Sequence, residues 1–80
     1  MIDVETKLRQ FRRELHPKVS QEKLAQAAGV SRQWYHLLET GKQEHVSYTT
    51  AHAILRAINA ERLSRNLEAL SLDQLGMKIV

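Results

Sequence analysis

The chain has 80 residues, a formal net charge of +3 at pH 7, 42% hydrophobic residues, 26% charged residues and no cysteine. This length and composition exclude two domains, a disordered chain, a transmembrane helix of roughly 18 apolar residues, disulfides and thiolate chemistry. We therefore expect a single soluble domain over residues 1–80, with a small core that is stabilised by helix packing alone or by a second subunit.

The first predicted helix spans residues 4–15, where apolar side chains recur at helical spacing. Asp3 is available as its N-cap, and Pro17 closes the segment. The outer face of this helix is basic. Most such residues are only solvated, and Arg12 and Arg13 are the candidates for a phosphate contact.

Residues 20–42 have the sequence SQEKLAQAAGVSRQWYHLLETGK, which predicts two short helices joined by a tight turn. Ser20 can cap the first helix, and Gly29 supplies the permissive backbone that a sharp helix end needs. Ser31 can cap the second helix, which runs over residues 32–40. This order of elements is that of a helix-turn-helix.

A polar loop over residues 42–47 is expected to precede a longer helix. That helix begins at Ser47 or Tyr48 and buries one apolar face. Residues 59–70 keep leucines at helical spacing but are dense in charge. They either extend the longer helix or form a separate one.

The last predicted helix covers residues 72–75. Ser71 and Gln74 have the spacing of a capping box, and Gly76 ends the helix. The apolar tail, residues 77–80, has no predicted structure, and no strand-like alternation, repeat or low-complexity linker is visible. The fold class is therefore all-α, a compact bundle of five helices, or four. Its expected core is Leu8, Phe11, Leu15, Leu24, Ala28, Val30, Tyr35, Leu38, Ile54, Leu55 and Ile58.

With these elements in place, the chain resembles the lambda-repressor-like family, which includes the Cro and cI-type phage repressors and the XRE-family regulators. The resemblance covers residues 4–58, and about ten residues, 60–69, depart from it. It implies that helix 32–40 enters the major groove of DNA while helix 21–28 lies across the backbone. The residues that carry it are Gln21, Leu24, Ala25, Gly29, Val30, Ser31, Leu38, Glu39, Gly41 and Lys42.

The expected DNA contacts divide into two groups. The base readers are the outward residues of helix 32–40, among which Arg32 can pair with guanine and Gln33 with adenine. The backbone contacts use the positive end of helix 21–28 and nearby basic groups. The base readers are Arg32, Gln33, His36 and Leu37, and the backbone contacts are Ser20, Gln21, Ser31, Lys42, Arg12 and Arg13.

Three apolar residues of helix 32–40 are unusual for the family. Trp34 and Leu37 could form a patch that contacts thymine methyl groups, or Trp34 could pack in the core or against a protein partner. Tyr35 points inward, and its hydroxyl is expected to reach the edge, where it would meet a phosphate or a main-chain group. In this family Glu39 looks structural, and its carboxylate is expected to pair with a basic residue of the first helix, such as Arg9 or Arg13, and not to contact DNA.

Other chemistry has little support in the sequence. The four histidines, His16, His36, His45 and His52, lack the spacing of a metal site, and no nucleophile turn or phosphate loop is present. We therefore expect no enzyme activity, no metal, no cofactor, no small-molecule ligand and no membrane contact. An antitoxin-like or adaptor protein that uses the same fold to bind a protein is the alternative to DNA binding.

These inferences combine into one expected function. The protein is a sequence-specific, repressor-like transcriptional regulator that binds double-stranded DNA as a homodimer, in the cytoplasm of a bacterium or as a phage protein. Residues 59–80 form a C-terminal extension of the domain. Its leucines, Leu63, Leu67 and Leu70, together with the apolar tail, are the candidate dimer surface, with simple core packing of the leucines as the alternative.

Overall fold

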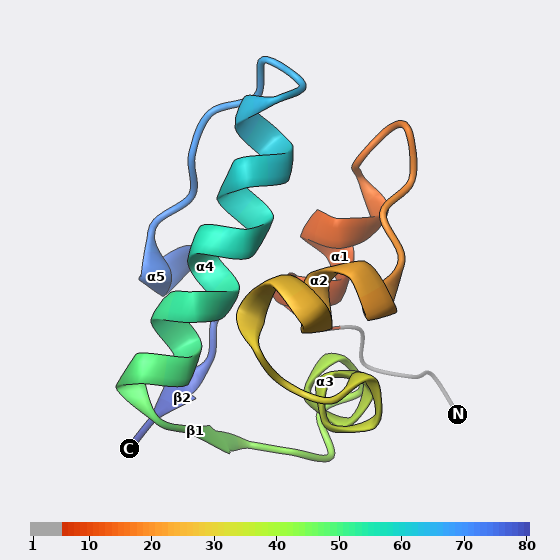
Figure 1. The fold of residues 1–80 in the computed structure, drawn as a ribbon. Coiled ribbons are helices and arrows are strands. Elements are labelled where there is room, and N and C mark those ends of the chain that lie inside the picture. The colour runs from red at the N-terminus through yellow and green to blue at the C-terminus, as the bar shows by residue number, and fades with distance from the viewer. Residues whose placement is uncertain (1–5) are drawn as a thin grey trace, which may run out of the picture.

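A computed structural model of the chain describes residues 6–80. It is mostly helical, as predicted, and its longest helix lies beside the short last helix (Figure 1). The elements are α1 (Lys7–Arg13), α2 (Gln21–Ala28), α3 (Arg32–Glu39), β1 (His45–Val46), α4 (Tyr48–Leu63), α5 (Leu72–Leu75) and β2 (Lys78–Ile79).

Helix α1 is shorter than predicted. Its N-cap is Thr6, whose hydroxyl accepts a hydrogen bond from Arg9 N at 3.2 Å. The proposed cap Asp3 and the start at residue 4 lie outside the described residues. At the other end the helix stops at Arg13, and Leu15 follows it in irregular backbone, where it is nonetheless fully buried.

The turn between α2 and α3 forms as predicted. Gly29 ends α2 in the left-handed region at φ +75°, which a residue with a side chain adopts only at a cost. Val30 N then donates to Ala25 O at 3.0 Å. Ser31 caps α3 by accepting a hydrogen bond from Trp34 N at 3.1 Å. Figure 1 shows α3 nearly end-on below α2, so the two helices cross steeply.

Residues 59–70 divide between α4 and an irregular return segment. Helix α4 continues to Leu63, and the chain reverses through Asn66, whose φ is +61°. Asn59 then holds the returning chain against α4: its amide donates to Leu70 O at 3.0 Å and accepts from Leu70 N at 2.7 Å. These two bonds satisfy both backbone groups of a residue that is not helical.

The C-terminal segment is part of the folded structure. Ser71 N donates to Gln74 Oε1 at 2.7 Å, the reach-back bond of the predicted capping box. Beyond α5, strand β2 pairs in parallel with β1, with His45 opposite Lys78 and Val46 opposite Ile79. The prediction of a polar loop over residues 42–47 is therefore wrong at His45–Val46, and the tail, for which the sequence predicts no structure, contains the strand Lys78–Ile79. Two-residue strands lack the alternation that would reveal them.

The core lies between α4 and the other helices. Eight of the eleven predicted core residues are buried, while Phe11, Ala28 and Val30 are partly buried and pack against the core. The core also contains residues that were not included in the predicted core: Val19, Ala25, Val46, Ala51, Ala57, Leu70 and Leu75. No helix among residues 6–80 is long and apolar enough to cross a membrane.

Candidate nucleic-acid interface

The N-terminal end of α2 and the outer side of α3 share one face of the molecule. A surface hollow of about 510 Å³ on this face is lined by Gln21, Arg32, Gln33 and His36. The side chains of Arg32 and Gln33 are exposed and make no hydrogen bond to any residue that the structure describes. They are consequently available to an external partner.

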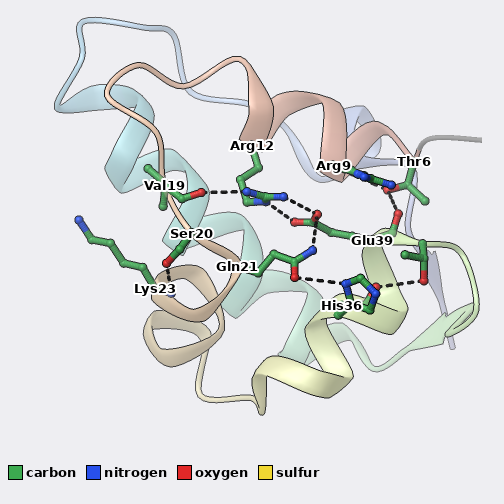
Figure 2. Close-up of polar contacts among 10 residues, drawn as sticks. Thr6, Arg9, Arg12, Val19, Ser20, Gln21, Lys23, His36 and Glu39 are labelled. Atoms are coloured by element: carbon green, nitrogen blue, oxygen red, sulfur yellow. Dashed lines mark hydrogen bonds and ion pairs between the residues drawn. The ribbon is translucent and has the colours of Figure 1, made fainter.

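Beneath this face, the carboxylate of Glu39 is fully buried and paired with Arg12 (Figure 2). Arg12 Nε lies 2.6 Å from Glu39 Oε2, and Arg12 Nη2 lies 3.0 Å from Oε1. The hydrogen bond to Glu39 raises the pKa of Arg12. Glu39 therefore pairs with a basic residue of α1, as predicted, but this residue is Arg12 and not Arg9 or Arg13, the two examples given.

The same geometry corrects the expected role of Arg12. Its remaining terminal nitrogen, Nη1, donates to Val19 O at 2.9 Å. All three guanidinium nitrogens are thus bonded inside the protein, and only 16% of the side chain is exposed. Arg12 holds α1 against α3 and the segment before α2. It is therefore not placed to contact a DNA phosphate.

Gln21 connects the buried pair to the surface. Its Nε2 donates to Glu39 Oε1 at 3.0 Å, and its Oε1 lies 3.2 Å from His36 Nδ1. Figure 2 shows this amide between the two side chains. The predicted phosphate contact of Gln21 therefore depends on its backbone N–H, at the first turn of α2, more than on its side chain.

The remaining backbone-contact candidates keep their expected positions. Ser20 Oγ accepts from Lys23 N at 3.0 Å, so it caps α2 as predicted, and Ser31 caps α3. A capping hydroxyl still has its proton to donate, because the cap uses the oxygen as an acceptor. Arg13 and Lys42 are exposed. Lys42 directly follows the turn that ends α3, where Lys42 N donates to Leu37 O at 2.9 Å.

The aromatic residues of α3 face inward. Trp34 is partly buried and packs against the core, which favours the core alternative. Tyr35 is fully buried, so the expectation that its hydroxyl reaches the edge is wrong. Burial, reinforced by the nearby Glu39 charge, raises the pKa of Tyr35 above its ordinary value. Leu37 is partly exposed beside the base-reading candidates.

Tyr35→Phe is expected to leave the free energy of unfolding unchanged or to raise it by up to about 1 kcal/mol. The reason is that the buried Tyr35 hydroxyl has no partner in hydrogen-bonding geometry within the described part of the chain, despite the nearby carboxylate of Glu39. Denaturant unfolding of both proteins measures the difference. A loss of more than about 1 kcal/mol would show that the hydroxyl is bonded in solution.

The leucines proposed as a dimer surface do not behave alike. Leu70 is 7% exposed and belongs to the core, so the core alternative applies to it. Leu63 and Leu67 are 59% and 37% exposed, respectively. Only these two of the three leucines remain accessible to another chain.

Sequence reasoning predicted that Glu39 pairs with the first helix, but it missed that Arg12 is the partner and that the carboxylate is fully buried, although one signal of the burial was present. Tyr35, Leu38 and Glu39 have the spacing of a single helix face, and all three are buried. A carboxylate on an apolar face needs a cation inside the protein. Which of the arginines of α1 supplies the cation depends on how α1 lies across α3, and this was not visible in the sequence.

Comparison with known proteins gives one match. A family model described as a helix-turn-helix domain matches residues 6–67. No curated protein and no solved structure matches the chain closely enough to show a relationship. The matched range contains α1 to α4, including every residue that lines the hollow.

Proposed function

Because the chain belongs to the helix-turn-helix domain family, we propose that it binds double-stranded DNA with α3 in the major groove and the start of α2 against the backbone. The observation that carries this proposal is the hollow where Arg32 and Gln33 lie exposed and unbonded beside Gln21 and His36. Domains of this kind are binding modules, so the proposal includes no catalytic step.

The proposed contacts follow from the chemistry of the side chains. Arg32 has the donors to pair bidentately with O6 and N7 of guanine, and Gln33 has the donor and acceptor that match adenine. Leu37 offers apolar surface to a thymine methyl group. The backbone amides at the start of α2 and the ammonium of Lys42 supply sequence-independent phosphate contacts.

A repressor-like regulator that acts as a homodimer is the finer part of the proposal. One module of this size buries roughly 600–1,000 Å² on DNA, which seldom gives tight specific binding alone. Two copies on half-sites about one helical turn apart would double the contacts. Leu63 and Leu67 are the exposed apolar residues of the C-terminal extension that a second copy could cover.

A salt titration of duplex binding tests the proposed function. Affinity for both random and selected duplexes should fall linearly in a plot of log affinity against log salt concentration, because neutralised phosphates release counterions. The selected sequence should retain its advantage over the random one. Failure to bind either duplex at any salt concentration would reject DNA binding and favour the adaptor alternative. Trp34 gives that alternative less support than the sequence suggested, because the side chain packs partly against the core.

Arg32→Ala and Lys42→Ala should weaken DNA binding in different ways. Arg32→Ala is expected to cost about 1–3 kcal/mol on the selected site and to relax base preference at one position. Lys42→Ala is expected to weaken all sequences alike and to reduce the salt slope by about 1. Selection of bound sequences, combined with salt titrations, measures both effects. An unchanged sequence preference for Arg32→Ala would exclude Arg32 as a base reader.

A further inference from the structure

A chain of hydrogen bonds connects the buried carboxylate of Glu39 with the exposed imidazole of His36 through the amide of Gln21 (Figure 2). The Gln21 amide is 3.0 Å from the carboxylate on one side and 3.2 Å from His36 Nδ1 on the other. The nitrogen His36 Nε2 makes no hydrogen bond to any residue among 6–80, and the side chain of His36 is exposed. This nitrogen is free to meet a base edge.

The direction of each bond in this chain follows from its chemistry. The Glu39 carboxylate is paired with the Arg12 guanidinium, and an ionised carboxylate only accepts hydrogen bonds. The amide nitrogen of Gln21 must therefore face Glu39, which leaves its carbonyl oxygen facing His36. A carbonyl oxygen also only accepts, so His36 Nδ1 must be the donor. A neutral imidazole has one N–H group, and Nε2 is consequently an acceptor.

We propose that Gln21 is a positioning residue, which holds neutral His36 as its Nδ1–H tautomer and thereby presents Nε2 to DNA as a hydrogen-bond acceptor. This inference rests on the proposed function. An acceptor in the major groove pairs with an exocyclic amino group, N4 of cytosine or N6 of adenine, and is repelled by O6 of guanine and O4 of thymine. Gln21 thus sets which base His36 selects without touching that base.

The tautomer can be measured without DNA. Imidazole ¹⁵N NMR at alkaline pH, where the ring carries one proton, should show the proton of His36 on Nδ1. In Gln21→Met the preference for Nδ1–H should be lost, so that His36 resembles the exposed His16 and His45. Gln26→Met is the matched control, because Gln26 is exposed on the same helix and its side chain makes no hydrogen bond to any of residues 6–80.

The effect on base selection is tested with a double-mutant cycle. His36→Ala should relax the preference at one base pair by about threefold to tenfold, the value of one hydrogen bond. Gln21→Met should relax the preference at the same base pair, and the double variant should lose no more than His36→Ala alone. Gln26→Met should leave the preference unchanged. Thermal unfolding identifies any variant that loses its fold. The NMR measurement of the His36 tautomer in the unmodified protein does not depend on any variant.

The outcomes separate this inference from the proposed function. If the unmodified protein shows no salt-dependent duplex binding, the proposed function fails and the reading role of His36 fails with it. If the protein binds DNA but His36 carries its proton on Nε2, the inference is overturned and DNA binding stands. Losses at different base pairs, or additive losses in the double variant, also overturn the inference.

Discussion

Replacing Arg12 with methionine is expected to lower the free energy of unfolding by about 3–5 kcal/mol. The Glu39 carboxylate is 0% exposed, and Arg12 supplies two of its hydrogen bonds. Without the guanidinium the charge stays buried, and Gln21 is its remaining side-chain partner among residues 6–80. A domain of about this size has a total stability of roughly 4–12 kcal/mol, so the variant should be partly or wholly unfolded at moderate denaturant concentrations.

Two further variants show whether the loss comes from the unpaired charge. Arg56→Met is the matched control, because Arg56 is exposed on α4 and takes part in no ion pair that the structure describes. Its effect should stay within about 0.5 kcal/mol. Combining Arg12→Met with Glu39→Met removes both charges, and the double variant should be more stable than Arg12→Met alone. Urea unfolding of these three variants, of Glu39→Met alone and of the unmodified protein measures the differences, and strictly additive losses for Arg12→Met and Glu39→Met would contradict the interpretation.

Replacing Leu75 with alanine is expected to lower the free energy of unfolding by about 2–5 kcal/mol. Leu75 is the only residue of α5 that is fully buried, at 2% exposed, and α5 packs against both α1 and α4. The truncation would leave a cavity under a helix of four residues. Denaturant unfolding at fixed protein concentration gives the measurement.

The control for this substitution is Leu63→Ala, which changes a leucine that is 59% exposed at the end of α4. In the monomer, Leu63→Ala should leave the free energy of unfolding nearly unchanged. Equal losses for the two variants would show that α5 does not contribute to the core in solution. A loss for Leu63→Ala that changes with protein concentration would instead indicate that this leucine is covered by a second copy.

The predictable part of the fold consists of features that are local in the chain. The bounds of α2, the left-handed Gly29 and the serine caps all follow from neighbouring residues, because a helix end is decided within one turn. The start of α1 was predicted less well. Thr6 lies at the cap, and its hydroxyl also donates to Glu39 O at 2.7 Å, a contact across the fold that no local pattern reveals.

The candidate site divides in the same way. The outward positions of Arg32, Gln33 and His36 follow from helical spacing, and the structure places all three around one hollow with Gln21. The role of Arg12 did not follow, since an arginine on a basic helix face has the same pattern whether it meets a phosphate or a buried carboxylate. Tyr35 was predicted to be inward, but not to be wholly enclosed.

By itself, the sequence determined the helix-turn-helix and the residues that α3 presents outward, because caps, left-handed glycines and helical spacing act over a few neighbouring residues. Only the tertiary structure decided that Arg12 neutralises Glu39, that Gln21 links this pair to His36, and that Leu70 and Leu75 complete the core. These contacts join residues far apart in the chain. They depend on how helices cross and where two-residue strands meet, and neither has a periodic signature.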